Sequence, residues 1–268
     1  MSPSELYLYE LQERRAKRKW RLRWLFLFLG LYGLTLGGLW LLLVSPVPRF
    51  KNIVITGNSK MGRDQILEIL RATVFENLWR RNLLGFNNIL AWPGNLRLEN
   101  MVLLPTVKSI NVKRDLINKT VRVTVEDRNP YGIWCVQTAP QNCYWFDDEG
   151  VIFKKTAIVE GSLIRAVNDY SGRVIGLNFR VLPEQFLKNI FQILETTENL
   201  GLSVKEVRID SLEKEELTAI TYAGVAFYFG LRYPAGNLAS AIDALRQKVD
   251  FDKLEYVDFR VENRVYYK

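Results

Sequence analysis

Three consecutive carboxylates, Asp147, Asp148 and Glu149, stand directly before Gly150 and form the densest group of side chains that could do chemistry. Paired carboxylates can bind a divalent cation or act as the acid and the nucleophile of a hydrolase. An aspartate-rich run that ends in glycine is also the usual composition of a tight turn. We favour the turn, because no motif elsewhere in the sequence supports an acid pair.

Histidine is absent from all 268 residues. Its absence excludes serine, histidine and aspartate triads, cysteine and histidine nucleophiles, and nearly all zinc enzymes built on imidazole ligands. An enzyme without histidine needs paired carboxylates or a lysine base, and the sequence contains no motif that places one. We therefore expect no catalytic activity, no metal site and no cofactor.

The two cysteines, Cys135 and Cys143, are separated by a polar stretch that contains a proline. If residues 133–136 and 143–146 are the arms of a hairpin, the cysteines fall opposite each other, which is compatible with disulfide spacing. Disulfides form in oxidising compartments outside the cytosol. The sequence therefore predicts a structural disulfide, with two free thiols as the alternative.

An uncharged apolar run at residues 25–44 follows a short basic segment. Twenty helical residues span about 30 Å, which matches the hydrocarbon core of a bilayer. Trp20, Trp24 and Trp40 stand near the two ends of the run, where aromatic rings prefer the headgroup level. A cleaved signal peptide would have a shorter apolar region and an Ala-x-Ala-like site after it. We predict a retained transmembrane helix.

The basic segment predicts the orientation of that helix. Residues 1–24 carry seven basic and three acidic residues, which is half of the net charge of +8. Because basic flanks stay in the cytoplasm, we expect a cytoplasmic tail at residues 1–24 and an exported C-terminal part. The other half of the charge is spread along the chain without a basic patch among aromatic residues, so we expect no nucleic-acid binding.

Residues 50–127 have the pattern of a small α+β unit. We expect a strand at 50–56, helices at 63–71 and 95–104, and strands at 107–113 and 120–126. The second of these helices would end before Pro105. Between the helices, residues 73–94 are irregular and rich in tryptophan and leucine, including Trp79 and Trp92. This stretch either rests on the membrane surface or, as we favour, packs on the sheet of its own unit.

From residue 128 to residue 268 the pattern is mostly strands with two helices. The expected strands are 133–136, 144–146, 151–153, 163–167, 204–209, 217–222 and 225–229, and the helices are 183–199 and 238–249. Two further alternating segments, 256–261 and 264–268, close the chain. We expect the last strand to be a sheet edge, whose unpaired backbone groups can bind a partner's strand.

The order of these motifs behind one apolar helix resembles the FtsQ/DivIB family of bacterial cell-division proteins. The motifs that carry the resemblance are FKNIVITGN at 50–58, PTV at 105–107, INVKR at 110–114, residues 121–127 with RNP at 128–130, FDDEGVIF at 146–153 and YVDFR at 256–260. Phe259 stands where leucine is usual, the stretch at 79–92 is longer than usual, and the cysteine pair is not a general feature of the family.

The resemblance implies that residues 50–127 form a POTRA domain, ordered β-α-α-β-β, and that residues 128–268 form the family's mostly antiparallel β domain. It also implies a scaffold without enzymatic activity in the cell membrane at the division septum. Such a scaffold is recruited through its POTRA domain, binds FtsB/DivIC-like and FtsL-like proteins, and helps to regulate septal wall synthesis.

The family's partner site lies on the closing strands. The resemblance maps this site onto Tyr256, Val257, Asp258, Phe259, Arg260, Val261, Arg264 and Val265. We expect a short strand of the FtsB-like protein to pair there, with Arg260 available for a carboxylate of the partner. In the alternative, Tyr256 and Phe259 are core residues and Arg260 is merely solvated.

Two other functions remain as alternatives. One is a POTRA-containing chaperone or secretion component, although such proteins typically carry a membrane β-barrel or several POTRA domains in series. The other is a membrane-anchored wall hydrolase that uses two carboxylates, such as Asp147 with Glu149.

Overall fold

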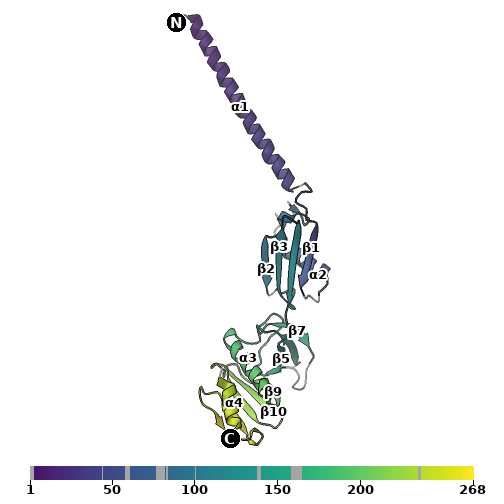
Figure 1. Cartoon of the computed structure of the whole chain (residues 1–268), viewed down its shortest axis with the longest axis vertical. Coiled ribbons are helices and arrows are strands. Elements are labelled where there is room, and N and C mark those ends of the chain that lie inside the picture. Colours follow the sequence, from purple (N-terminus) through teal and green to yellow (C-terminus); the bar gives the residue numbers. More distant parts are fainter. Residues whose placement is uncertain are drawn as a thin grey trace. The chain divides into compact units, whose positions relative to one another are not determined.

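A computed structural model of the chain describes residues 3–43, 45–57, 61–76, 82, 84–99, 101–137, 140–157, 165–234 and 237–268. The protein is α+β, as predicted, with one long N-terminal helix followed by two sheets (Figure 1). The chain divides into two compact units. The first contains the long helix and most of a four-stranded sheet, and the second contains a nine-stranded sheet.

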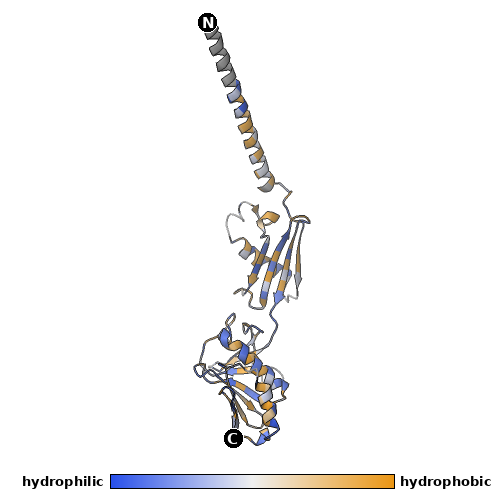
Figure 2. Ribbon diagram, turned by 60° about the vertical axis from the view of Figure 1, so that its left-hand side comes forward, coloured by the Kyte–Doolittle hydropathy of each residue, from blue (hydrophilic) through white to orange (hydrophobic). Residues whose placement is uncertain are grey.

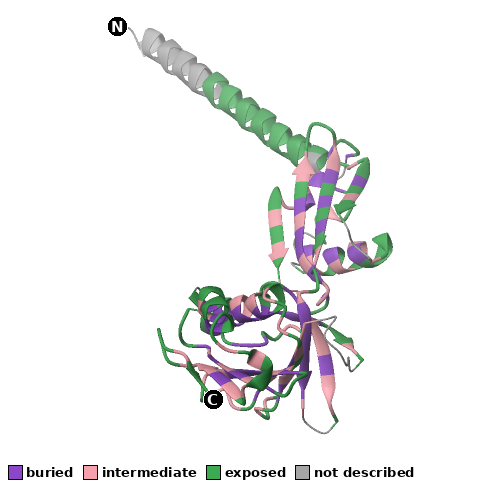
Figure 3. Ribbon diagram, turned by 60° about the horizontal axis from the view of Figure 1, so that its bottom comes forward, coloured by how far each residue is buried: buried purple, intermediate pink, exposed green. Residues whose placement is uncertain are grey.

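Helix α1 spans Pro3–Leu43 without a break, so it also takes in the basic segment that precedes the apolar run. Between Lys19 and Leu41 it is long and apolar enough to cross a membrane, as predicted. Every side chain in that span is exposed (Figure 3). The residues at 25–41 include no charged side chain, so this part of the helix is apolar all round, and Figure 2 shows one side of it. A helix that is apolar all round needs a non-aqueous environment. Val44, the last residue of the predicted run, lies outside the described residues.

The four-stranded sheet has the strand order β1-β4-β3-β2. Its strands are β1 (Asn52–Gly57), β2 (Asn95–Glu99), β3 (Val107–Asp115) and β4 (Thr120–Asp127). The alternation of β4 buries Val121, Val123 and Val125 on one face, as its sequence predicts. Helix α2 (Arg63–Val74) begins where it was expected and buries Ile66 and Leu70, which are four residues apart.

The helix predicted at residues 95–104 is wrong, because strand β2 takes its place. Leu96 and Leu98 are half-buried and alternate with exposed neighbours, which is the two-residue period of a strand. Pairing with β3 at the edge of the sheet fixes this conformation. The described residues therefore follow the order strand, helix, strand, strand, strand, which differs from the expected β-α-α-β-β arrangement.

The irregular stretch after α2 packs within its own unit where it is described. Trp92 is buried, and its indole nitrogen donates a hydrogen bond to the backbone oxygen of Phe86 at 3.0 Å. Its ring meets the rings of Phe75 and Phe50 edge to face. A short 3-10 helix at Ile89–Ala91 continues this packing. Trp79, which was named in the same stretch, lies outside the described residues.

The second sheet has the strand order β13-β12-β11-β10-β9-β8-β5-β6-β7. Its strands are β5 (Gly132–Val136), β6 (Asn142–Phe146), β7 (Ile152–Thr156), β8 (Ala166–Asp169), β9 (Val204–Ile209), β10 (Glu216–Thr221), β11 (Ala226–Gly230), β12 (Tyr256–Phe259) and β13 (Tyr266–Tyr267). The strand predicted at residues 163–167 begins at Ala166, and Leu163 and Ile164 lie outside the described residues. The sheet is mixed, because β5 with β8, β8 with β9, and β11 with β12 are parallel.

Two helices, α3 (Glu184–Asn199) and α4 (Leu238–Arg246), cover one face of this sheet and bury a row of side chains that face each other across six strands. The row is Trp134, Val167, Val207, Ala219, Phe227 and Val257. At the adjacent position of each of these strands, and at Tyr266 of β13, the opposite face carries a row that is mostly polar. This row is Cys135, Asn168, Arg208, Thr218, Tyr228, Asp258 and Tyr266.

Gly150 and Gly172 have similar backbone conformations but different surroundings, so comparing alanine substitutions at the two positions tests the packing around Gly150. Both have positive φ angles, +73° and +75°. A Cβ atom on Gly150 would lie 2.6 Å from Cδ2 of Leu187, whereas one on Gly172 would meet nothing within 4 Å. We expect Gly172→Ala to lower the free energy of unfolding by about 1 kcal/mol through backbone strain. Gly150→Ala should lower it by a further ~1–3 kcal/mol through overpacking.

Urea titration of the full chain in detergent, followed by tryptophan fluorescence, measures both losses. Equal losses for the two variants would contradict the close contact between the turn at Gly150 and Leu187.

Candidate partner-binding edge

The closing strands form one edge of the nine-stranded sheet, as predicted. Strand β12 lies parallel to β11, and α4 is the crossover between them. A turn follows in which the backbone nitrogen of Arg264 donates to the oxygen of Val261 at 3.2 Å. The chain then returns as β13, antiparallel to β12.

The outer side of β13 presents backbone groups of Tyr267. Tyr256 and Lys268 exchange two backbone hydrogen bonds, of 3.2 and 3.4 Å. In an antiparallel pair, hydrogen-bonded positions alternate with positions whose N–H and C=O groups point away from the partner strand. Tyr267, one residue before Lys268, therefore directs its N–H and C=O away from β12. A strand from another molecule can pair there.

The eight residues predicted for the partner site are divided between core and surface. Val257 is fully buried beneath the helices, and Phe259 stacks on Phe229 with ring centroids 5.6 Å apart. Tyr256, Asp258, Arg260 and Val265 are partly buried, and Val261 and Arg264 are exposed. Strand β12 therefore supports the edge and does not itself form it.

The residues that form the edge, Tyr266 and Tyr267, were not among the predicted site residues. Their side chains are 45% and 48% exposed, and they alternate to opposite faces of the strand. The alternation from Arg264 to Lys268 was the available signal, since it already predicted a final strand through both tyrosines.

Arg260 is engaged within its own sheet, and its pairing with a carboxylate of a partner stays a prediction. Its guanidinium donates to Asp258 at 2.9 and 2.6 Å and to Glu216 of β10 at 3.0 Å. It also lies over the ring of Tyr228, 4.9 Å from the centroid. Hydrogen bonding to Asp258 raises the pKa of the guanidinium above its usual value. Arg260 braces β12 against β10 across the intervening β11.

Asp258 is held in its charged form by the same contacts. Burial acts to raise the pKa of its carboxyl, but hydrogen bonds from the side chain and backbone of Arg260 outweigh burial, and the pKa is lowered. The side chain is only 14% exposed. Asp258 is therefore an internal partner of the sheet's polar face.

An apolar groove lies beside the edge, on the side of the sheet that α4 covers. Its volume is about 460 Å³, and its apolar part is lined by Phe229, Leu238, Phe259, Val261 and Val265. Polar residues, among them Asn237, Glu262, Asn263 and Arg264, line the rest. Val261 and Val265, which were predicted to contact a partner strand, line this groove. The edge thus combines free backbone groups with an apolar hollow, the two features that bind an extended peptide.

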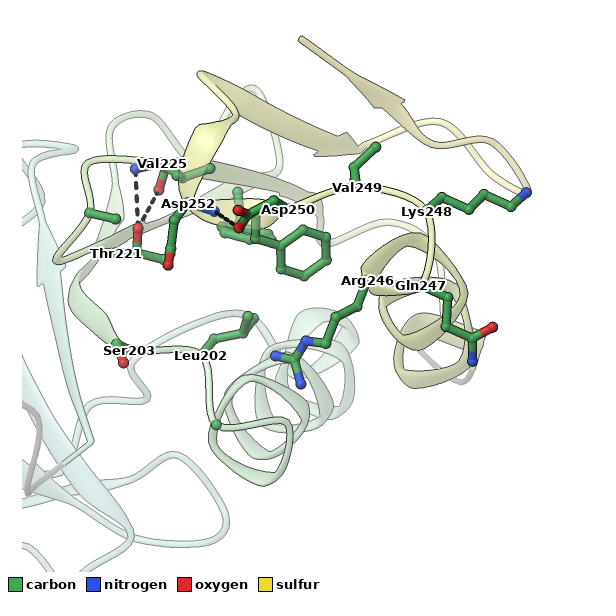
Figure 4. A pocket seen from close by; sticks show the side chains of 14 residues that line it. Leu202, Ser203, Thr221, Val225, Arg246, Gln247, Lys248, Val249, Asp250 and Asp252 are labelled. Atoms are coloured by element: carbon green, nitrogen blue, oxygen red, sulfur yellow. Dashed lines mark hydrogen bonds between the residues drawn. The ribbon is translucent and has the colours of Figure 1, made fainter.

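A larger cavity of about 670 Å³ lies at the other end of the same strands, beyond the C-terminal ends of α3 and α4 (Figure 4). Arg246 donates to the backbone oxygen of Leu200 at 2.8 Å and lies over the ring of Phe251. The hydroxyl of Thr221 bonds the backbone of Val225, and Lys248 points away from the cavity. The side chains of Arg246 and Thr221 are thus bonded within the fold, and we assign no chemistry to the cavity.

The three consecutive carboxylates do not converge on a site. Asp147 is fully buried, accepts hydrogen bonds from the backbone nitrogens of Glu149 and Val151, and pairs with buried Arg128. The side chains of Asp148 and Glu149 are 67% and 47% exposed. The run is a turn between β6 and β7. Among the described residues, no group of three His, Cys, Asp or Glu side chains could hold a metal ion.

Cys135 and Cys143 lie directly opposite each other in the β5 and β6 hairpin and are joined by a disulfide. With Ile133 they form a small buried cluster on the sheet face opposite the helices. The predicted hairpin and the predicted disulfide are both confirmed.

No protein-family model matches this chain, and no curated protein matches it.

Asp258→Asn should remove a charged partner of Arg260. A carboxyl whose pKa is lowered by folding stabilises the protein above its unfolded pKa of about 3.9 and loses that contribution as the pH falls through the folded value. We expect the variant to be about 1–2 kcal/mol less stable at pH 7. The difference from the unaltered chain should shrink below about pH 4.

Urea titrations at pH 7 and pH 3 measure the difference, with exposed Asp252→Asn as the control that should change little at either pH. A loss for Asp258→Asn that is the same at both pH values would show that the charge of Asp258 does not support the brace.

Proposed function

We propose that this protein is a single-pass scaffold of the bacterial divisome, of the FtsQ/DivIB type, that binds a partner's strand at β13. The observation that carries the proposal is the outward backbone of Tyr267, which lies two residues after Val265, where the groove lined by Phe259 and Val265 ends. Short exposed edges are a liability for a soluble protein unless they are used or protected. A sheet edge next to an apolar groove is suited to binding an extended segment of a partner.

The anchor and the disulfide support an exported second unit. The Lys19–Leu41 part of α1 has the length and composition of a membrane span, and the basic segment before it favours a cytoplasmic N-terminus. The bond between Cys135 and Cys143 is of a kind that persists in oxidising compartments. Both features agree with a C-terminal part outside the cytoplasm.

Partner binding combines two contributions at the edge. Strand β13 is only two residues long, so backbone pairing supplies few hydrogen bonds. An apolar side chain of the partner that enters the groove contributes about 1.5–3 kcal/mol more when it is fully buried. We assign the partner's strand that pairs with β13 to an FtsB/DivIC-like protein. An FtsL-like protein belongs to the same complex, and other divisome components bind the first unit.

Tyr267→Pro should abolish partner pairing and leave the fold intact. Proline removes the outward N–H, and proline is tolerated on an edge strand when its missing N–H faces solvent. Tyr267→Val is the matched control, because it keeps the N–H and favours a strand. Full chains carrying an affinity tag would be purified from native membranes and their FtsB/DivIC-like and FtsL-like partners quantified. We expect at least a tenfold loss for the proline variant and near-normal recovery for valine.

Equal partner recovery from the two variants, with unchanged thermal unfolding of both, would reject the edge as the binding site.

A fluorescent protein fused to the N-terminus should concentrate at the septum of dividing cells, because a divisome scaffold assembles there. The Tyr267→Pro chain reports whether partner pairing contributes to that enrichment. A uniform signal around the envelope for the unaltered chain would remove the division proposal and leave only a membrane anchor.

A further inference from the structure

The loop between β3 and β4 has an apolar tip. Ile117 is 93% exposed and Leu116 is 51% exposed. Asp115 accepts hydrogen bonds from the backbone and side chain of Asn118, at 3.0 and 2.8 Å, so the loop is held in one conformation. Turn positions usually carry polar residues or glycine. Two adjacent aliphatic side chains at a fixed tip, surrounded by water, are therefore unusual.

Hydrogen bonds place this tip at the same end of the sheet as the chain that leaves α1. The backbone nitrogen of Lys51 donates to the oxygen of Lys119 at 2.8 Å. Lys119 lies two residues beyond Ile117, so the tip and the entry into β1 are neighbours.

The link between α1 and this end of the sheet is short. Ser45 is still bonded to α1, through its nitrogen to Trp40 and its hydroxyl to Leu41. Pro48 is already bonded to the folded unit, because its oxygen accepts from the nitrogen of Ile89 at 2.7 Å. Three residue steps cover at most about 10 Å. A membrane that holds α1 therefore lies within reach of this end of the first unit.

Positive charge accompanies the apolar tip. Arg49 and Lys51 are exposed at the entry to β1, and Lys119 is partly exposed beside them. The carboxylate in the loop, Asp115, is paired with Arg122 at 3.0 Å. Apolar side chains with a basic surround bind the interface of a bilayer that contains anionic lipid.

We propose that the β3 and β4 loop is a membrane contact, in which Leu116 and Ile117 enter the headgroup region of the leaflet next to the C-terminal end of α1. Arg49 and Lys51 pair with lipid phosphates around this contact. The inference rests on the proposed membrane anchor. The contact holds the first unit against the bilayer at a second point, in addition to the covalent link.

Fluorescence quenching in lipid nanodiscs tests the contact with the full chain. The native cysteines are joined in the disulfide, so Ile117→Cys can be labelled selectively with an environment-sensitive dye under non-reducing conditions. The discs contain equal amounts of phosphatidylglycerol and phosphatidylcholine, with a nitroxide attached near the lipid headgroup. The control is Val174→Cys, which is equally exposed and belongs to the second unit. We expect at least twofold stronger quenching at position 117 than at position 174.

A second substitution shows whether the tip or the dye causes the contact. Leu116→Asp on the Ile117→Cys chain should reduce quenching to the level of position 174. Leu103→Asp, at a leucine that is 71% exposed in the second unit, should leave quenching at position 117 unchanged. Equal quenching at positions 117 and 174, or quenching that persists in the Leu116→Asp chain, overturns the proposal.

A dye at Trp40→Cys separates this inference from the anchor itself. Quenching at position 40 without quenching at position 117 overturns the loop contact and leaves the anchor in place. Absence of quenching at both positions overturns both proposals.

Discussion

The parallel pairing of β12 with β11 is the constraint on which the C-terminal surface depends. A parallel neighbour requires the chain to cross over the sheet, and α4 makes that crossover. Ile242 and Leu245 of α4 are buried in the same cluster as Phe227 and Val257. Because β12 is fixed from one side by this packing and from the other by the polar brace at Arg260, the two residues of β13 have a rigid strand to pair with.

Both faces of the nine-stranded sheet stabilise the strands that support that edge, one by apolar packing and the other by polar contacts. The apolar face binds α3 and α4, and the side-chain nitrogen of Asn189 in α3 donates to the backbone oxygen of Leu231 at 2.6 Å, just after β11. The polar face holds its strands with side-chain pairs, such as Asn168 with Glu206 at 2.9 Å. Neither set of contacts uses the outer side of β13, so the fold can be complete while the edge stays open to a partner.

Alternation along the sequence predicted most strands, because the valines of β4 and the cysteine hairpin are specified by neighbours close in the chain. It failed at residues 95–104, where Leu96 and Leu98 fit a strand but leucines also recur at 103 and 104. The deciding interaction there is pairing with β3, which the local pattern does not encode. The hydrogen bond between Arg260 and Glu216 could not be predicted for the same reason, because the two residues are 44 positions apart in the chain. Most neighbouring strands of the described second sheet are antiparallel, as expected. The parallel pairs β5 with β8, β8 with β9, and β11 with β12 were not predicted, because parallel pairing leaves no local signature either.

The disulfide has a consequence for the order in which the second unit is built. It joins residues only eight positions apart, within one hairpin. In a chain exported behind its anchor, as proposed, this hairpin leaves the translocation channel well before the strands that later flank it. A thiol-oxidising enzyme can therefore form the disulfide while only a short segment has been exported. Strand β8 then pairs with a β5 that is already joined covalently to β6, and the later strands add beyond β8.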